Sequence, residues 1–225
     1  MRFVYPIREQ SQIEKIKKYL RARNERDYVL FLLGIHSGLR ISDLLALKVK
    51  DVTRGDRMII KEIKTGKTKS FPLAKAVLKE VGNYANQCKS DHLFPSRKGK
   101  GAITRQQAYL ILNGAARAAG IREPIGTHTL RKTFAYWAYK QGASLELIQK
   151  ILNHSSSSTT LRYLGRKSIQ SKSPHKCGLL FFRELFRELR AVFQHISDCF
   201  CCDAEGLFLW VYIPFHCDYG IGVTE

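Results

Sequence analysis

Apolar residues recur with a helical period along most of the first 165 positions. In the first such segment Ile13, Ile16 and Leu20 share one face, which predicts an amphipathic helix. The segment 25–36 is nearly all apolar and predicts a buried helix that stops near Gly38. Periodic segments further along predict helices at 43–50, 74–87, 104–119, 128–141, 144–152 and 158–164.

Hydroxyl side chains stand where several of these helices are expected to begin. Ser11 is followed three positions later by Glu14, the spacing of a capping box. Ser42 precedes the predicted helix 43–50, and Thr127 precedes the helix 128–141. A Ser or Thr oxygen accepts a hydrogen bond from a free backbone N–H of the first turn. These three residues are therefore predicted to be helix caps.

Two short segments break the helical pattern. Residues 57–63 and 69–73 have the character of strands and flank the turn 65–68, whose Gly66 suits a tight reversal. The pattern as a whole predicts a mainly α fold with a small antiparallel β-hairpin.

The composition and net charge indicate what kind of partner the protein binds. Of 225 residues, 44% are hydrophobic, enough for a core, and the formal net charge is +19 with a pI of about 9.9. So basic a protein is expected to bind a polyanion, most commonly nucleic acid. No apolar run approaches the ~18 residues that cross a bilayer, and the first residues lack a signal-peptide core. The expectation is a cytoplasmic, DNA-associated protein with no membrane contact.

The chain is expected to have two unlike parts, 1–167 and 168–225. Residues 175–225 carry a net charge of −3 and five of the six cysteines, whereas residues 1–174 carry +22. A Ser/Lys-rich linker is followed by a predicted amphipathic helix, residues 182–196, and a Cys-rich apolar tail. That helix is expected to dock either on a neighbouring subunit or on its own domain. The cysteine spacing does not suit zinc, so no metal site is expected.

Several residues in the basic part are candidates for phosphate chemistry. A planar guanidinium holds two phosphate oxygens at once and stays charged, and Arg40 and Arg131 stand near helix ends. His128 precedes Arg131 by three residues and so shares its face at a helix N-terminus, which favours anions. Taken singly, each has an ordinary reading as a solvated or capping side chain.

Four segments together resemble the tyrosine site-specific recombinases, the phage integrase family. Gly38-Leu39-Arg40-Ile41-Ser42-Asp43 resembles the first arginine motif, and His128-Thr129-Leu130-Arg131 resembles the His-x-x-Arg box. Leu152-Asn153-His154, with Tyr163 nine residues after the histidine, is similar to the last histidine and the nucleophile. The resemblance covers roughly residues 5–167, the catalytic domain only. The hairpin matches the place of the family's lysine, which aligns with Lys64, Lys67 being the competitor.

The resemblance implies a site-specific recombinase that cuts and rejoins DNA without cofactor or metal. Tyr163 would attack the scissile phosphate and form a 3′-phosphotyrosyl link. Arg40 and Arg131 would hold the phosphate oxygens, His128 would be the general base, and His154 would donate a hydrogen bond to the phosphate. Lys64 would protonate the leaving 5′-oxygen, and Asp43 would orient Arg40 or simply favour its helix N-terminus.

Other cations are expected to contact the DNA backbone and to give salt-dependent affinity. The candidates are Lys67, Lys69, Arg97, Lys98, Lys100, Arg105 and Lys132, several of them in the loop 95–101. Double-stranded DNA is the expected partner. The active form is expected to be a homo-oligomer, a tetramer on DNA, with a possible accessory DNA-bending protein.

Two departures from the family leave alternatives open. About ten residues precede the first predicted helix, so the family's N-terminal DNA-binding domain is expected to be absent, and the tail is unlike the family's short last helix. The alternatives are a non-catalytic DNA-binding regulator, an inactive integrase remnant and, more weakly, a topoisomerase-like relaxing enzyme. A covalent DNA adduct that requires Tyr163 separates the catalytic readings from the others.

Overall fold

The computed structural model describes residues 4–53, 57–61, 63, 66, 68–99 and 101–164. The helices are α1 (Gln10–Arg23), α2 (Glu25–Ser37), α3 (Ile41–Leu45), α4 (Val49–Thr53), α5 (Lys75–Gln87), α6 (Arg105–Ala118), α7 (Thr127–Lys140), α8 (Leu145–Leu152) and α9 (Ser157–Leu164). The strands are β1 (Arg57–Lys61) and β2 (Thr68–Pro72). The proposed second part, 168–225, with its amphipathic helix, lies outside the described residues.

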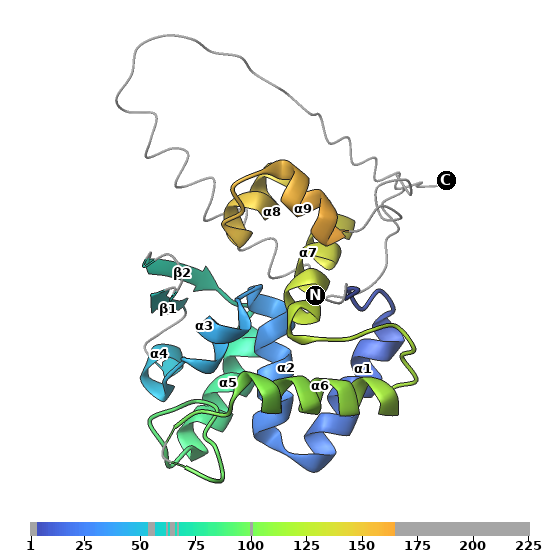
Figure 1. The fold of residues 1–225 in the computed structure, drawn as a ribbon. Coiled ribbons are helices and arrows are strands. Elements are labelled where there is room, and N and C mark those ends of the chain that lie inside the picture. The colour runs from blue at the N-terminus through green and yellow to red at the C-terminus, as the bar shows by residue number, and fades with distance from the viewer. Residues whose placement is uncertain are drawn as a thin grey trace, which may run out of the picture.

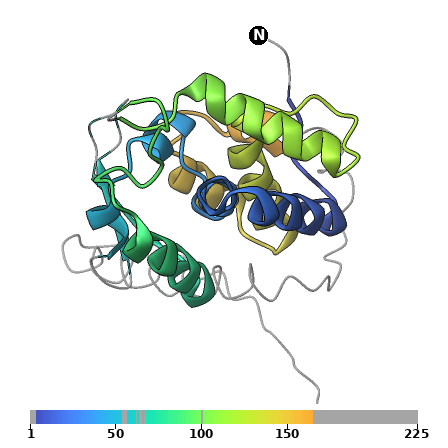
Figure 2. The same cartoon turned by 90° about the horizontal axis from the view of Figure 1, so that it is seen from below.

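Helix α2 forms the centre of the fold. Every residue from Tyr28 to Ser37 is buried, and the helix packs against α1, α5 and α7. Figure 2 shows α5 and α6 on opposite sides of α2. Burying a Leu or Phe side chain contributes about 1.5–3 kcal/mol each, so α2 supplies much of the core. The sequence prediction of a buried helix that stops near Gly38 is confirmed.

Two glycines let α2 approach α7 closely. A Cβ at Gly34 would lie 2.5 Å from Leu130 Cδ1, so no larger residue fits without movement. Gly38 ends α2 with φ of 62°, a left-handed conformation that favours glycine, and a Cβ there would lie 2.6 Å from Phe134 Cδ1. This reversal of the chain at Gly38 fixes the position of Arg40, two residues later.

The three predicted caps are wrong. Helix α1 begins at Gln10, after Glu9, because Ile7 is already held by α7: its N–H donates to Thr133 Oγ1 at 2.9 Å. Ser11 therefore lies inside the helix. Helix α3 begins at Ile41, one position before Ser42.

The N-terminus of α7 also differs from its predicted form. Gly126 is the N-cap residue, and its N–H donates to the Thr129 hydroxyl at 3.1 Å. Thr127 is buried in the first turn instead. The hydroxyl that satisfies this helix end therefore comes from two residues further along the chain than the sequence suggested.

The helix predicted at 43–50 is in fact two short helices, α3 and α4. Between them the backbone leaves the helical path because the Leu93 N–H donates to the Leu47 carbonyl at 3.0 Å and Lys48 bridges His92. These tertiary hydrogen bonds override the local helical pattern.

The short strands lie beside α3 and α4 (Figure 1). They are antiparallel, with Ile59 opposite Ser70 and Lys61 opposite Thr68. Residues 62–67 connect them, and the candidate lysines Lys64 and Lys67 in this connection lie outside the described residues.

At the other end of the molecule α8 and α9 cover α7 (Figure 1). Ser144 caps α8 by accepting a hydrogen bond from the Leu147 N–H at 3.2 Å. Among the described helices none has the length and apolar character needed to cross a membrane.

Candidate active site

A buried arginine joins the two chain segments that carry the other candidate residues. Arg131 is 3% exposed, and its Nη1 donates to the Gly38 carbonyl at 2.5 Å. Its Nη2 donates to the Leu152 carbonyl. Gly38 precedes Arg40 by two residues, and Leu152 precedes His154 by two. One guanidinium on α7 therefore fixes the positions of the segments that present Arg40 and His154.

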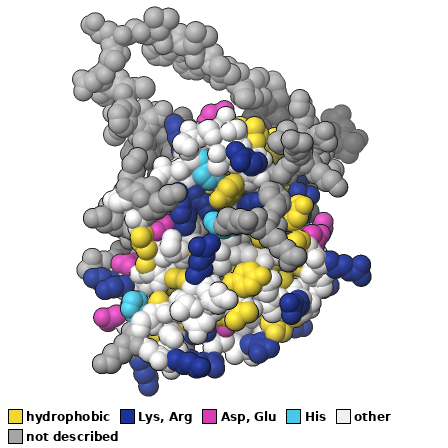
Figure 3. All heavy atoms as spheres, in the orientation of Figure 1, with side chains coloured by type: hydrophobic (Ala, Val, Ile, Leu, Met, Phe, Trp, Pro, Cys, Tyr) yellow, Lys and Arg dark blue, Asp and Glu magenta, His cyan; other side chains and the backbone are white. Residues whose placement is uncertain are grey.

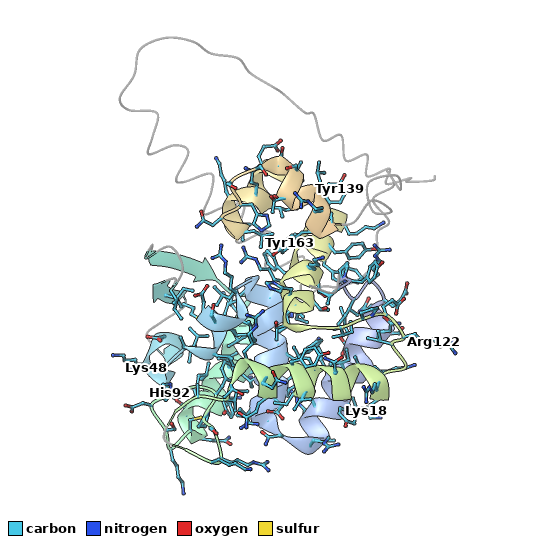
Figure 4. The ribbon with its side chains drawn as sticks, viewed as in Figure 1. Lys18, Lys48, His92, Arg122, Tyr139 and Tyr163 are labelled. Atoms are coloured by element: carbon cyan, nitrogen blue, oxygen red, sulfur yellow. The ribbon has the colours of Figure 1, made fainter. Side chains whose placement is uncertain are left out.

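Tyr163 and His154 are in ring contact. Their ring centroids lie 4.6 Å apart with the planes at 63°. The positive edge of one ring faces the negative face of the other in such an arrangement. Figure 4 shows Tyr163 at the junction of α9 with α7.

The position of His154 follows from local structure. Asn153 ends α8 in a left-handed conformation with φ of 50°, which turns the chain toward α9. The His154 ring then has its Nδ1 3.0 Å from the hydroxyl of Thr160, a fully buried residue of α9. The Thr160 contact is made by Nδ1, and Nε2 is the second nitrogen of the ring. This geometry suits a histidine that donates a hydrogen bond to a phosphate.

His128 lies in the first turn of α7, where positive charges converge. Burial lowers its pKa below the ordinary value, and the nearby charges of Arg105, Arg131, Lys132 and Arg40 lower it further. A neutral imidazole at neutral pH is the form that can accept a proton. The same charges form a binding place for an anion.

The charge of Arg105 helps to lower the pKa of His128. Because its charge is the largest electrostatic contribution to the lowered pKa of His128, Arg105→Gln should raise that pKa toward the ordinary 6.5. The pH dependence of imidazole NMR signals measures this. In the wild type the ring should stay neutral to lower pH than in the variant. Arg117→Gln, an exposed arginine on the same helix, is the control. Equal His128 pKa values in wild type and Arg105→Gln would refute the electrostatic account.

Arg40 stands opposite a buried carboxylate. Its Nη1 lies 4.0 Å from Asp43 Oδ2, and Asp43 is 3% exposed. The other carboxylate oxygen, Oδ1, accepts the backbone N–H of Ile63 at 3.0 Å. Asp43 therefore ties Arg40 to the residue directly before Lys64. The sequence suggested that Asp43 orients Arg40 or favours its helix N-terminus, and no local signal could have revealed the contact with Ile63, 20 residues away.

A pocket of about 1040 Å³ opens beside this cluster. His128, Lys132 and Tyr163 line one part of it, and Arg105 and Arg162 contribute further positive charge. Lys and Arg side chains gather around histidines in the middle of the face shown in Figure 3. The pocket can therefore receive an anionic group next to Tyr163.

The expected DNA-contacting cations fall into different places. Arg105 is exposed at the pocket, whereas Arg97 and Lys98 are exposed at the tip of a loop closed by the Pro95–Ala102 bridge and do not line it. Lys67, Lys100 and the side chain of Lys69 lie outside the described part.

Lys132 differs from an exposed phosphate contact. It is 7% exposed, and its ammonium lies 5.5 Å from the centroid of the Tyr163 ring. The i,i+4 spacing of His128 and Lys132 places both residues on one face of α7.

Known proteins with similar sequences include integrases and recombinases. The sequence model of the phage integrase family matches residues 8–168. The probable integrase/recombinase YoeC of Bacillus subtilis (strain 168) is 44% identical over 177 residues, which are 78% of this chain and 97% of that protein. The tyrosine recombinase XerD of Listeria monocytogenes serotype 4b (strain F2365) is 31% identical over 67% of this chain. The match covers 54% of XerD, so the chain spans about half of that relative.

Solved structures with the same fold include recombinases in complex with DNA. XerA recombinase superposes with a TM-score of 0.63 at 21% identity, over 84% of this chain and 67% of that one. XerH site-specific recombinase bound to its difH substrate superposes with a TM-score of 0.60 at 25% identity, over 72% of this chain and 51% of that one. A lambda integrase tetramer bound to a Holliday junction superposes with a TM-score of 0.59 at 18% identity, over 74% of this chain and 50% of that one. The mainly helical catalytic-domain fold expected from the sequence is confirmed.

Proposed function

Because the chain belongs to the phage integrase family, the tyrosine recombinases, we propose that it cuts and rejoins DNA strands at specific sites through a covalent link to Tyr163. The observation that carries this proposal is that Tyr163 and His128 line one pocket, while His154 is in ring contact with Tyr163 and the buried Arg131 holds the segment just before His154. These residues come from α7, α9 and the segment between α8 and α9. Their approach is a property of the fold that no single motif contains.

The proposed reaction assigns each group one task. His128 accepts the phenolic proton as Tyr163 attacks phosphorus, and the bond to the 5′-oxygen breaks. Arg40 and His154 donate hydrogen bonds to the non-bridging oxygens, where charge accumulates. Arg131 adds positive charge beside them and holds the segments that carry both residues. Lys64 gives a proton to the departing 5′-oxygen, which leaves as a hydroxyl, and this role rests on the sequence alignment with the hairpin.

The energy of the broken phosphodiester is kept in the phosphotyrosine, so a second 5′-hydroxyl can attack it in the reverse step. No part of this sequence of steps calls for a metal ion or a cofactor. We accordingly propose metal-independent strand exchange, with neither metal nor nucleotide needed for cleavage.

DNA is the proposed partner, on the face that carries the pocket. Arg105 is proposed to contact the backbone there, and the loop with Arg97 and Lys98 to contact it further along the duplex. Exchange of two duplexes cuts four strands, and each chain supplies one tyrosine. An assembly of four chains on DNA is therefore proposed for the active form, as in the lambda integrase tetramer bound to a Holliday junction.

Cleavage is testable although the target site is unknown. A pool of randomised duplexes with nicks at varied positions traps the intermediate, because the short fragment beyond the cut diffuses away. The wild type should form a denaturant-resistant protein–DNA complex in buffer containing EDTA. Tyr163→Phe should form none, since phenylalanine has no hydroxyl to attack phosphorus.

Tyr139→Phe is the matched control, because Tyr139 is a half-buried tyrosine on α7. It should form the adduct at the wild-type rate. Equal adduct formation by wild type and Tyr163→Phe would contradict the proposed mechanism. DNA binding without any adduct would favour a non-catalytic DNA-binding protein.

A further inference from the structure

A lysine that the reaction described above does not use lies against the nucleophile. The Lys132 ammonium is 5.5 Å from the centroid of the Tyr163 ring. The same nitrogen donates a hydrogen bond to the Val4 carbonyl at 2.8 Å. With 7% of its surface exposed, Lys132 is held within the protein, whereas a lysine that serves as a backbone contact extends into solvent.

The backbone that holds this ammonium is itself fixed to α7. The Ile7 N–H donates to Thr133 Oγ1 at 2.9 Å, and the Ile7 carbonyl accepts the indole N–H of Trp137 at 3.0 Å. The Tyr5 N–H donates to the Pro124 carbonyl at 3.4 Å. The segment 4–7 therefore presents the Val4 carbonyl at a fixed place, and Lys132 is fixed with it.

Burial of a lysine is costly, so its position needs a compensating interaction. Desolvation lowers the pKa of Lys132, and the Val4 carbonyl accepts a hydrogen bond from its ammonium. The electron-rich face of the Tyr163 ring supplies a favourable cation–π contact. A fixed positive charge beside the ring also favours a transition state in which negative charge develops on the Tyr163 oxygen.

We propose that Lys132 is a positioning residue for strand cleavage: anchored by the Val4 carbonyl, its ammonium holds the Tyr163 ring at the pocket and stabilises the negative charge that develops on the phenolic oxygen. This rests on the proposed function of Tyr163. The phenolic proton still passes to His128. Lys132 stays protonated throughout and neither accepts nor donates a proton in this step.

Other charged or ionisable groups also face Tyr163, and their effects on cleavage must be distinguished from that of Lys132. His154 contacts its ring, and His128 and Arg105 line the same pocket from α7 and α6. Arg162 is its neighbour on α9. Substitutions at Lys132 alone, which leave these groups in place, isolate the contribution of its charge.

The test compares Lys132→Met, Lys132→Arg and, as a matched control, Lys140→Met, a lysine at the far end of α7. Single-turnover adduct formation is measured at saturating nicked DNA between pH 6 and 10, with DNA affinity and thermal stability measured beside it. Lys132→Met should cleave about tenfold more slowly near neutral pH, because one cation–π and charge interaction is lost. Lys132→Arg and Lys140→Met should stay within about twofold of wild type.

The pH profile distinguishes this role from a structural one. The deficit of Lys132→Met should shrink as pH rises, because burial lowers the pKa of Lys132 and the wild type therefore loses this charge at high pH. DNA affinity and its salt dependence should be unchanged.

Three results would overturn the inference: a wild-type rate and pH profile in Lys132→Met, an equal defect in Lys132→Arg, or a defect that vanishes at higher DNA concentration, as for a phosphate contact. Each leaves the proposed function intact if the adduct still depends on Tyr163. Failure of the proposed function is instead recognised by an adduct that persists in Tyr163→Phe.

Discussion

Replacing Arg131 with lysine should lower the free energy of unfolding and nearly abolish cleavage in the same variant. The guanidinium donates at once to the Gly38 and Leu152 carbonyls, which lie on segments far apart in the sequence. A lysine ammonium lacks the planar fork and cannot reproduce both bonds. A buried carbonyl left without a donor costs about 1–3 kcal/mol, so a loss of about 2–4 kcal/mol is expected.

The loss of cleavage in Arg131→Lys should also appear in the folded fraction of the variant, so unfolding alone does not explain it. Displacement of the segments that carry Arg40 and His154 removes hydrogen bonds to the phosphate, and cleavage should fall by about 10²–10³-fold at a temperature where the variant is folded. Chemical denaturation and adduct formation measure the two effects. Arg23→Lys, at an exposed arginine on α1 that does not line the pocket, is the control and should change neither. A folded Arg131→Lys that cleaves normally would show that the two carbonyl contacts do not organise the site.

Replacing Asp43 with alanine should reduce cleavage by about 100-fold, as expected when catalytic groups shift by about 1 Å. The Asp43 carboxylate faces the Arg40 guanidinium and also accepts the Ile63 N–H. Without it, neither Arg40 nor the residue before Lys64 keeps its position. Both a phosphate-binding group and the proposed general acid are affected.

An asparagine at position 43 separates the two contacts. Asp43→Asn keeps an oxygen for the Ile63 N–H but loses the charge beside Arg40, so its rate should lie between those of wild type and Asp43→Ala. Single-turnover cleavage at saturating DNA is the measurement, with Asp91→Asn, an exposed carboxylate, as the control. If Asp43→Ala and Asp91→Asn cleave equally fast, Asp43 has no positioning role.

Sequence reasoning succeeded where the information is local. The period of Ile13, Ile16 and Leu20 predicts the buried face of α1, and all three are buried. The spacing of His128 and Arg131 predicts that both belong to one helix, as they do in α7. Gly38 ends α2 because only a left-handed residue fits there.

The errors arose where distant contacts outweigh local preference. The helix expected at 43–50 is broken because Leu47 and Lys48 pair with residues near 92. Ser11 is no cap because the chain before α1 is already held by α7.

The candidate site shows the same division. The residue types and their order were evident from the sequence, but the contacts that position them were not. Arg131, which the resemblance places at the phosphate, also joins two segments through their carbonyls, and the sequence did not reveal these contacts. Lys132 was expected to contact DNA, and the structure places its ammonium beside the Tyr163 ring, a contact that the sequence did not reveal. Such arrangements depend on which segments meet in three dimensions, and a sequence pattern carries no record of that.

The most direct test of the central claim is to identify the atom that carries the DNA. The complex trapped on nicked duplexes is digested with nuclease and protease, and the modified peptide is sequenced by mass spectrometry. The account predicts a 3′-phosphonucleotide on Tyr163 and a free 5′-hydroxyl on the released strand. A nucleotide attached to any other residue, or linked through its 5′-phosphate, would contradict it.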